Sequence, residues 1–292
     1  MSSDTGKVLV AGASGRLGRH VRSELAARGR ATRALVRDAK RVEAAGAGEV
    51  FVGDARAAES LRGACEGVAA VVSALGASLA LGLTPKRATF REIDLRANLN
   101  LLAEAKRAGV GKFVYVSLYG AETLRGLAYV DAHEEFVAAL RASGLEHAVV
   151  RPTGFFYVFG EIFKMAARGR VALVGDGSAR TNPVHERDVA LACVAGLDAD
   201  VKELAVGGPE TYTRRGVAEM AFAALGRPPK ISSLPPRVVL ALTAPLKLFD
   251  RRLYDLLEFG VAASTTDLIA PAYGERSLAE YFRRLASGAG EV

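Results

Sequence analysis

Hydrophobic and polar positions follow two different periodicities along the first half of the chain. Short runs rich in β-branched residues are typical of buried strands, and longer runs with apolar residues three and four positions apart are typical of helices. The predicted strands cover residues 7–11, 31–36, 49–52, 68–74, 112–117 and 146–151, and the predicted helices cover residues 17–28, 61–66, 90–108 and 131–143. This alternation predicts an α/β fold with a parallel sheet that is covered by helices on both faces.

The regular alternation ends near residue 152. Beyond it we expect helices over residues 155–167, 185–197, 213–225 and 237–259, and a short strand over residues 171–174. The proline-rich stretch 227–236 predicts a loop between the last two helices. The chain then divides into a sheet domain, residues 1–153, and a small, mainly helical substrate-side subdomain, residues 154–292. Strand and helix contributions near residues 171–197 are expected to return to the core of the first domain.

A glycine-rich loop connects the first predicted strand to the first predicted helix. One glycine permits the sharp turn, a second lets backbone amides approach a pyrophosphate, and the third permits close packing of the helix on the strand. The helix N-terminus adds its partial positive charge. In this context the motif predicts a Rossmann-type doubly wound sheet with a dinucleotide site. The loop reads Gly12-Ala13-Ser14-Gly15-Arg16-Leu17-Gly18, and the cofactor-binding residues predicted in it are Gly12, Ser14, Gly15, Arg16, Leu17 and Gly18.

The end of the second predicted strand distinguishes NADP from NAD. An NADP site places arginine there to meet the 2′-phosphate, whereas an NAD site places an acidic residue there to hold the ribose hydroxyls. Arg37 falls at this position, and Arg16 in the glycine loop can reach the same space. A planar guanidinium suits a phosphate because it can donate two hydrogen bonds at once. We therefore predict NADP(H) as the cofactor, while Asp38, one residue further on, keeps NAD(H) as the alternative.

The glycine spacing G-x-x-G-x-x-G resembles that of the extended and atypical branches of the short-chain dehydrogenase/reductase superfamily, and the resemblance extends from residue 7 to about residue 188. Members that carry out chemistry use a serine at the end of the fifth strand and a tyrosine about twelve residues later as proton donor, followed after four residues by a lysine. Ser117 and Tyr129 match the first two positions, and His133 stands at the lysine position. The resemblance therefore implies a catalytic set of Ser117, Tyr129 and His133.

Histidine at position 133 changes the acid–base chemistry that the lysine would provide. Residues four apart share one face of a helix, so Tyr129 and His133 should be neighbours. A permanent cation beside the tyrosine would favour its phenolate, whereas histidine is charged only below about pH 6.5 unless its surroundings raise its pKa. A neutral imidazole could still hydrogen-bond the ribose. Two interpretations follow: a reductase with altered acid–base tuning, or a protein that retains the cofactor and has lost efficient turnover.

Other segments take part in the site by resemblance. Asp54 follows the third strand, where related proteins hold the adenine ring, and it is equally a candidate turn residue. The residues after the fourth strand, Ala74, Leu75 and Gly76, are expected to line the cofactor, and Pro152 lies where the sixth strand passes the nicotinamide. The aromatic residues that follow form either a substrate wall or part of the core, and they are Phe155, Phe156 and Tyr157.

This arrangement is similar to that of isoflavone-reductase-like proteins, divinyl chlorophyllide reductases and the nucleotide-binding accessory subunit of respiratory complex I. Some of these relatives reduce substrates and others only bind NADPH, so the fold leaves the function open. We predict an NADPH-dependent reductase of a small, largely apolar carbonyl or activated alkene, because a pure binder would not require Ser117 and Tyr129 at this separation. The alternative is a non-catalytic NADP(H)-binding redox sensor or assembly factor. A third class, a sugar-nucleotide epimerase or dehydratase, normally needs the tyrosine–lysine pair and tightly held NAD.

Composition adds limits on partners and location. The net charge of +7 is spread over the 292 residues, whereas a nucleic-acid binder would concentrate it on one face. We therefore expect no nucleic-acid partner. The two cysteines and four histidines form no cluster with metal-ligand spacing, so we expect no metal. The N-terminus lacks a signal-peptide pattern, and a cytoplasmic location follows as the default.

The most apolar stretch of the chain, residues 238–246, is too short to span a bilayer. We interpret it as part of a packed helix. The alternative is a membrane-surface or partner-binding helix within residues 237–259. A homodimer through the long helices is an expectation from family resemblance alone.

Overall fold

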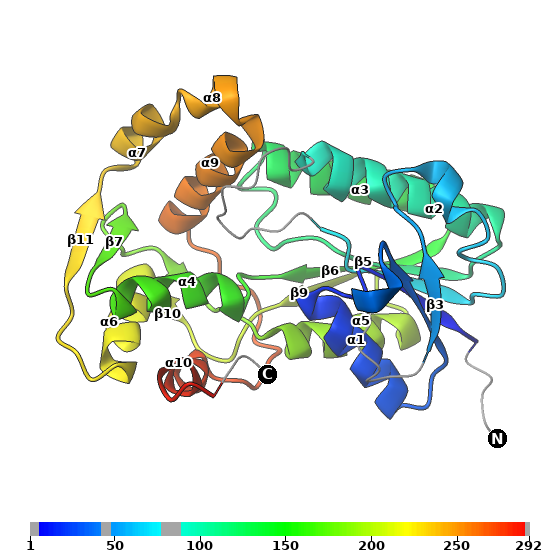
Figure 1. The fold of residues 1–292 in the computed structure, drawn as a ribbon, viewed down its shortest axis with the longest axis horizontal. Coiled ribbons are helices and arrows are strands. Elements are labelled where there is room, and N and C mark those ends of the chain that lie inside the picture. Colours follow the sequence, from blue (N-terminus) through cyan, green and yellow to red (C-terminus); the bar gives the residue numbers. More distant parts are fainter. Residues whose placement is uncertain (1–5, 42–47, 77–88, 290–292) are drawn as a thin grey trace.

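The computed structural model describes residues 6–41, 48–76 and 89–289 (Figure 1). The first five residues, in which no signal-peptide pattern is expected, lie outside these ranges. The main element is a seven-stranded parallel sheet with the strand order β3-β2-β1-β4-β5-β6-β9. Its strands are β1 (Val8–Ala11), β2 (Thr32–Val36), β3 (Glu49–Val52), β4 (Ala70–Ser73), β5 (Lys112–Val116), β6 (Glu146–Pro152) and β9 (Glu203–Val206).

This sheet confirms the predicted Rossmann-type architecture. All six strands predicted in the first half are present, and they are followed in the sheet by β9, which the sequence analysis missed. β9 reads Glu-Leu-Ala-Val at the sheet edge and has a single β-branched residue, whereas each of the other strands of this sheet has two. The strand order reverses between β1 and β4, and ligands of such sheets bind at the carboxyl ends of the strands at this switch point.

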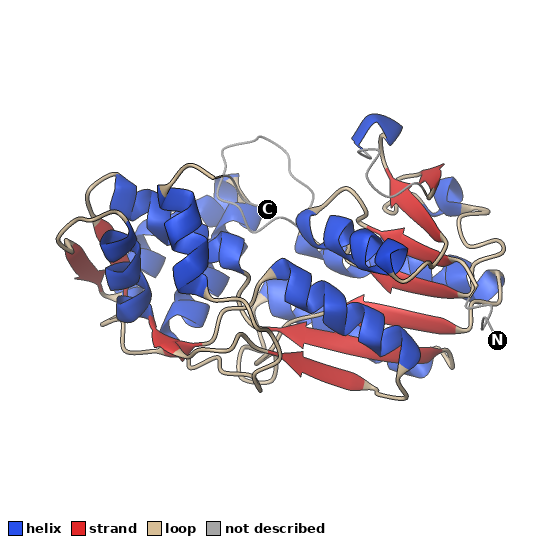
Figure 2. Ribbon diagram, turned by 90° about the horizontal axis from the view of Figure 1, so that it is seen from below, coloured by secondary structure: helices blue, strands red, loops and turns tan. Residues whose placement is uncertain are grey.

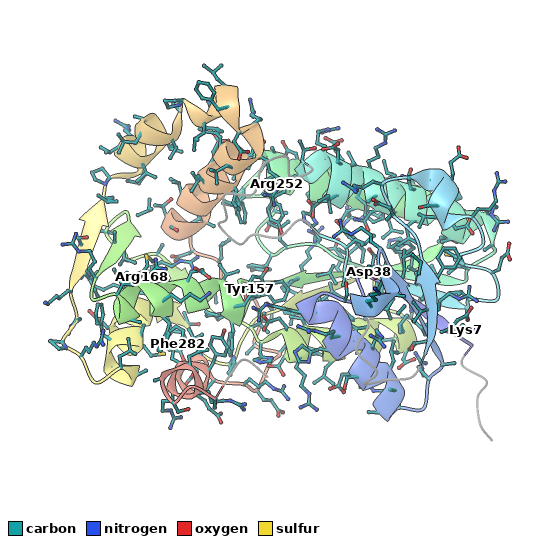
Figure 3. The ribbon with its side chains drawn as sticks, in the orientation of Figure 1. Lys7, Asp38, Tyr157, Arg168, Arg252 and Phe282 are labelled. Atoms are coloured by element: carbon teal, nitrogen blue, oxygen red, sulfur yellow. The ribbon has the colours of Figure 1, made fainter. Side chains whose placement is uncertain are left out.

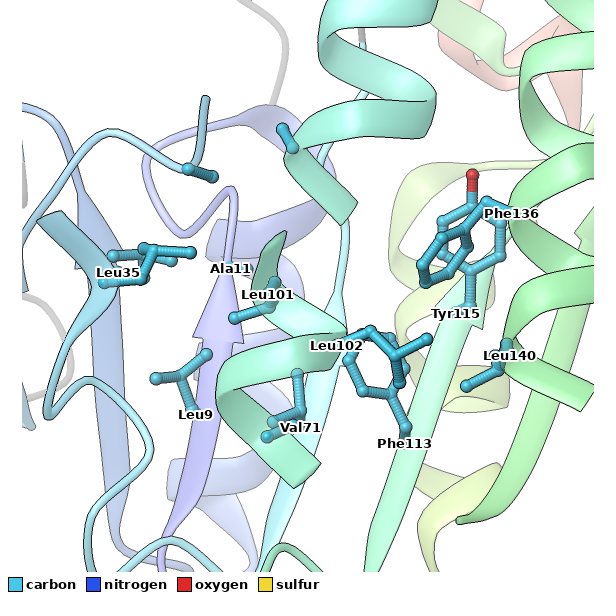
Figure 4. Packing of buried hydrophobic residues seen from close by; sticks show 14 of the residues in the cluster. Leu9, Ala11, Leu35, Val71, Leu101, Leu102, Phe113, Tyr115, Phe136 and Leu140 are labelled. Atoms are coloured by element: carbon cyan, nitrogen blue, oxygen red, sulfur yellow. The ribbon is translucent and has the colours of Figure 1, made fainter. Parts of the chain in front are cut away.

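Helices cover the two faces of the sheet, as Figures 1 and 2 show. On one face α1 (Arg16–Ala27) packs beside α5 (Glu186–Asp198) over a core of valine and alanine side chains. On the other face lie α2 (Asn98–Arg107) and α3 (Ala128–Ala142), over a larger core in which Tyr115 and Phe136 pack together (Figure 4). Each face is apolar because the buried strands carry hydrophobic residues on both sides.

Two helical predictions on this half need correction. The long helix predicted over residues 90–108 begins as a π-helical segment, Arg91–Ala97, and becomes α-helical only from Asn98 onward. The short helix predicted over residues 61–66 is instead a 3₁₀ helix, Ala58–Leu61, followed by turns in which Gly63 and Gly67 adopt positive φ. Glycine is the residue that readily adopts this conformation, so the chain cannot continue as a helix there.

The C-terminal part is mainly helical and has its own core. This core lies between α4 (Phe156–Ala167), α6 (Arg214–Ala224) and α10 (Leu278–Ala286), the last of which was not predicted. Two small sheets complete it: β7 (Val171–Val174) pairs with β11 (Ile231–Leu234), and β8 (Arg180–Thr181) pairs with β10 (Tyr212–Thr213). The strand at residues 171–174 was expected to return to the core of the first domain, but it pairs with β11 instead. The elements that do return to the central sheet are α5, which packs on it, and β9, which joins it. The proline-rich stretch contains a strand, β11, as well as loop.

The helix predicted over residues 237–259 is broken into three. These are α7 (Pro236–Thr243), α8 (Leu246–Phe249) and α9 (Arg251–Thr265). Pro245 cannot donate a backbone hydrogen bond, and the Asp250 carboxylate caps α9 by accepting the amide of Leu253 at 3.0 Å. The interpretation of residues 238–246 as part of a packed helix is confirmed in part, because α7 and α8 pack on α9 but neither contains a buried residue. Within the described ranges, every helix falls short of the length and apolarity that a membrane crossing requires.

Candidate nucleotide-binding and active site

The glycine loop lies at the switch point of the sheet, against the chain leaving β4. Gly12 has φ +76°, and a Cβ atom added to it would lie 2.5 Å from the Ala74 carbonyl oxygen. A Cβ on Gly18 would lie 2.2 Å from the Gly12 carbonyl oxygen, so α1 can approach the loop only because residue 18 lacks a side chain. The Gly15 amide donates to the Gly12 carbonyl at 2.9 Å and closes the turn. These contacts show the sharp turn and the close helix packing expected of the motif.

The N-terminus of α1 fits a pyrophosphate. Gly15 occupies the N-cap position and has no side chain that could accept the amides of the first helical turn. Those amides, together with the positive end of the helix dipole, are the groups that bind phosphate in such loops. Ser14 is half-buried beside them, and Leu17 packs on the core beneath α1. The residues present therefore fit a dinucleotide.

The close contact at Gly18 leads to a prediction. Gly18→Ala should lower the free energy of unfolding by about 1–3 kcal/mol, because α1 must shift away from the loop, and it should weaken NAD(P)H binding. Chemical denaturation and calorimetry would measure the two effects. Gly260→Ala is the matched control, since a Cβ there meets nothing within 4 Å and α9 should gain up to about 1 kcal/mol. Equal stability and affinity in the two variants would contradict the prediction.

The residues at the ends of β2 and β3 were predicted to hold the adenosine. Arg37 is exposed directly after β2. The Asp38 carboxylate accepts the Lys40 amide at 3.0 Å, as in an ordinary turn. The Asp54 carboxylate accepts the Arg56 amide at 3.0 Å and pairs with the Arg56 guanidinium, which lowers the pKa of Asp54. Arg37 lies close enough to lower that pKa further, so Arg37 and Asp54 are neighbours at this end of the site.

Tyr157 joins the glycine loop to the C-terminal part. The Arg16 guanidinium lies 5.3 Å from the centroid of the Tyr157 ring, and this ring stacks on Phe155 with centroids 5.8 Å apart. Figure 3 labels Tyr157 near the middle of the molecule, where the helices of the C-terminal part approach the sheet. Arg16 thus contacts α4 in this structure. Pro152 is buried at the end of β6, and its carbonyl accepts the Tyr119 amide at 2.9 Å.

Phe156 lies in a different environment from its two neighbours. Its ring is 1% exposed and packs in the C-terminal core, 5.4 Å from the His185 ring and 5.5 Å from the Tyr281 ring. It borders a cavity of about 440 Å³ that is also lined by residues of α1, α5 and α10, among them His20, and by Arg276 in the loop before α10. Because successive helical residues point in different directions, α4 presents Phe156 to this core and Tyr157 to the glycine loop. Phe156 therefore has the core role that the sequence left open.

Tyr129 lies in the first turn of α3 inside an aromatic cluster. The centroid of its ring is 5.1 Å from Phe90, 4.7 Å from His133 and 4.6 Å from Phe259. Burial raises the pKa of the Tyr129 phenol well above its usual value, and the nearby Asp94 carboxylate raises it further. The phenol is therefore protonated throughout the neutral range. The predicted neighbourhood of Tyr129 and His133 is present.

His133 is directed into the protein. Its side chain is almost completely buried, its Nδ1 is hydrogen-bonded to the Tyr115 hydroxyl at 2.7 Å, and its Nε2 lies 3.3 Å from the Asp94 carboxylate. Asp94 is fully buried in the π-helical segment, and a Cβ on Gly76 would lie 3.4 Å from its Oδ1. His133 thus links Tyr115 of β5 to Asp94, which lies beside Gly76 in the chain leaving β4. Segments of π-helix occur frequently at functional sites.

A second pair of hydrogen bonds extends this buried network to β4. The Ser73 hydroxyl donates to the Asn98 side-chain oxygen at 2.5 Å, and the Asn98 amide donates to the Asp94 carbonyl at 3.0 Å. The sequence analysis missed Asp94 and Tyr115. A signal was available, because Asp94 occupies an apolar phase of its helix and Tyr115 lies in an otherwise buried strand. Polar residues at such positions need partners inside the protein.

Ser117 belongs to a neighbouring polar cluster. Its hydroxyl donates to Glu134 at 3.2 Å and accepts from Arg151 at 3.4 Å. Arg151 and Glu134 form an ion pair of 2.7 Å that is about one-tenth exposed. The structure therefore brings Tyr129 and His133 together, whereas Ser117 is hydrogen-bonded to Glu134.

Comparisons with known proteins identify the family of the chain. Residues 12–200 match the family model described as NAD(P)H-binding. Divinyl chlorophyllide a 8-vinyl-reductase of Zea mays is 28% identical over 316 residues, which cover 95% of this chain and 79% of that protein. A photosystem II assembly factor of Guillardia theta is 31% identical over 152 residues, which cover 51% of this chain and 46% of that protein.

Solved structures share the fold. An NADPH-dependent quinone oxidoreductase of Escherichia coli in complex with NADPH has a TM-score of 0.77 and 21% sequence identity, covering 95% of this chain and 99% of that one. The family match includes the glycine loop, the residues after β4, and Tyr129 with Phe90 and His133, whereas Phe259 lies beyond it. The chain therefore belongs to the NAD(P)H-binding family, within the short-chain dehydrogenase/reductase superfamily that its motifs indicate.

Proposed function

We propose that the protein is an NADPH-dependent reductase of a small, largely apolar carbonyl or activated alkene. The observation that carries this proposal is the protonated phenol of Tyr129 among Phe90, His133 and Phe259. Its neighbour His133 lies 3.3 Å from Asp94, and Asp94 lies beneath Gly76 of the chain leaving β4, against which the glycine loop packs. A proton donor in apolar surroundings beside a nucleotide loop suits the reduction of an apolar substrate.

The preference for NADP(H) is supported by the residues after β2. Arg37 is exposed there, whereas the Asp38 carboxylate is engaged with the Lys40 amide. A ribose 2′-phosphate would meet a guanidinium rather than a carboxylate, and charge-assisted hydrogen bonds of this kind are the stronger ones. The NADPH complex of the structurally similar quinone oxidoreductase is consistent with this preference.

The chemistry can be assigned to the chain's own residues. The bound nicotinamide would supply a hydride. Tyr129 then donates its phenolic proton to the substrate atom that has gained negative charge, and the phenolate regains a proton from water. Phe90 and Phe259 pack around the Tyr129 ring and contact the apolar substrate. His133 is a positioning residue in this scheme, since its ring is held by Tyr115 and Asp94.

The C-terminal residues supply the substrate side of the proposed site. Tyr157 comes from α4 and Phe259 from α9, while Tyr129 comes from α3. This supports the division into a nucleotide-binding domain, residues 1–153, and a substrate-side subdomain, residues 154–292. Phe155, stacked on Tyr157, extends the same aromatic wall.

The environment of His133 favours the second candidate, a non-catalytic NADP(H)-binding sensor or assembly factor. At the position where the family's enzymes carry a lysine, this chain has a buried histidine whose nitrogens face Tyr115 and Asp94. Such a ring does not offer the tyrosine a permanent cation. The similarity to a photosystem II assembly factor is consistent with this candidate.

One experiment separates the two functions. Calorimetric titration with NADPH and with NADH should show tighter binding of NADPH. NADPH oxidation is then measured against quinones, enones and aldehydes. Binding with turnover supports the reductase, whereas tight binding without turnover of any substrate class supports the sensor or assembly role. If neither nucleotide binds, both candidate functions fail.

A further inference from the structure

The tip formed by α7 and α8 exposes large apolar side chains. Among the described residues, the three most exposed large hydrophobic side chains are Leu242 (76%), Leu248 (85%) and Phe249 (85%), all within eight positions of the sequence. Figure 1 shows α7 and α8 projecting at one extremity of the molecule, and both helices pack on α9. Single exposed hydrophobic residues are ordinary, but a cluster of almost fully exposed leucine and phenylalanine side chains indicates an interaction surface.

The charges of the same segment indicate what covers it. From Pro236 to Phe249, the stretch that forms α7 and α8, the sequence contains no aspartate or glutamate, and it contains two basic residues, Arg237 and Lys247. Lys247 immediately precedes the two most exposed apolar residues, and Arg237 lies in the first turn of α7. An apolar face bordered by basic side chains is suited to the interfacial region of an anionic bilayer, where apolar burial and charge attraction act together.

The nearest carboxylates do not cancel this charge. Asp250, which caps α9 through the Leu253 amide, contributes one negative charge against the two positive charges of Arg237 and Lys247, and Asp255 forms an ion pair of 2.8 Å with Arg251. The Lys247 ammonium lies 4.4 Å from the centroid of the Tyr254 ring, which leaves its charge uncompensated by a carboxylate at that contact. The tip is therefore both apolar and positively charged. An anionic lipid surface matches both properties of the tip, whereas an apolar protein surface would match only the first.

We propose that the α7–α8 tip docks on an anionic lipid bilayer surface, with Leu242, Leu248 and Phe249 entering the interfacial region and Arg237 and Lys247 facing the lipid phosphates. The docking is peripheral and involves the tip alone. It does not depend on whether the chain turns over a substrate. Figure 3 places Arg252 at the α9 end nearest α3, and Arg252 lies 5.3 Å from the Phe90 ring centroid, so the docked tip is attached to the helix that packs beside the Tyr129 cluster.

Vesicle co-sedimentation of the full chain tests the proposal. The protein should bind vesicles that contain phosphatidylserine and should bind vesicles of phosphatidylcholine alone much less. Replacing both Leu248 and Phe249 with serine should lower the partition coefficient about tenfold or more, because the inserting side chains are lost. Neutralising the basic residues with Arg237→Gln and Lys247→Gln should lower it about tenfold on the anionic vesicles.

The controls separate docking from folding and from self-association. Val50→Ser, which removes a 40% exposed valine on β3, should bind the anionic vesicles like the unmodified chain. NADPH titration should be unchanged in every variant, which shows that the tip variants fold. Equal binding to both kinds of vesicle, or unchanged binding of the double serine variant, overturns the proposal. So does an unmodified chain that does not bind vesicles but forms a dimer which the double serine variant dissociates, because a second copy would then cover the tip.

Discussion

Tyr129→Phe is expected to lower kcat for NADPH oxidation about 100- to 10,000-fold, the range typical of a lost proton donor, while leaving NADPH affinity nearly unchanged. The substitution removes only the hydroxyl. The ring contacts with Phe90, His133 and Phe259 remain, so the aromatic cluster should keep its packing. Steady-state kinetics with an active substrate from the quinone, enone and aldehyde panel would measure the loss, and calorimetry would measure the affinity.

The matched control for this variant is Tyr273→Phe. Tyr273 is 38% exposed and lies outside the Tyr129 cluster, so its variant should retain full activity. In the proposed reductase the active form of Tyr129 is the protonated phenol, whose pKa is held well above its usual value by burial. The kcat/KM of the unmodified enzyme should therefore show no loss from this group as the pH rises to 10. Full activity of Tyr129→Phe, or an alkaline loss below pH 10 that this variant abolishes, would contradict the assignment.

The second large effect is expected at the cofactor. Arg37→Ala should weaken NADPH binding about 10- to 100-fold, since hydrogen bonds to charged groups contribute about 1.5–3 kcal/mol and each 1.4 kcal/mol is tenfold in affinity. NADH has no 2′-phosphate, so its affinity should change little. Calorimetric titration with both nucleotides at one salt concentration gives the two ratios. The salt concentration must be the same in both titrations, because Arg37 is exposed and salt screens its interaction with the phosphate.

Two comparison variants make the Arg37 result specific. Arg62→Ala removes another exposed arginine, after the 3₁₀ helix Ala58–Leu61, and should leave both affinities unchanged. Asp38→Ala tests the alternative, in which the carboxylate holds the ribose hydroxyls. A marked loss of NADH binding in Asp38→Ala, with equal losses for both nucleotides in Arg37→Ala, would reverse the assignment in favour of NAD.

Local patterns in the sequence predicted most of the nucleotide-binding half of the protein, but not β9 or the π-helical and 3₁₀ segments. The six strands, the helices on both faces and the glycine loop follow from apolar periodicity and from glycine at three spaced positions. Gly12 and Gly18 could be assigned before the structure because a missing Cβ has the same consequence wherever a helix approaches such a turn. The neighbourhood of Tyr129 and His133 was also predictable, since residues four apart on one helix always lie together.

Contacts between distant segments were not predictable in this way. His133 faces Tyr115 on β5 and Asp94 in the π-helical segment, and Tyr129 packs on Phe259 of α9, about 130 residues away. β9 joins the sheet at an edge that no local pattern identifies. The break of the 237–259 helix depends on Pro245 and the Asp250 cap, which the sequence shows, but the exposure of its apolar residues depends on how α7 and α8 pack.

The sequence by itself determined the fold class, the nucleotide loop and the identity of the residue that replaces the lysine, because each of these depends on residue types at short spacing. The tertiary structure decided what that residue does: burial against Tyr115 and Asp94 makes His133 part of an internal network. It also assigned Phe156 to the core and Tyr157 to the glycine loop, a difference of one residue on α4. The physical reason is that periodicity encodes which face of an element is apolar, whereas the partners of a face depend on the whole packed chain.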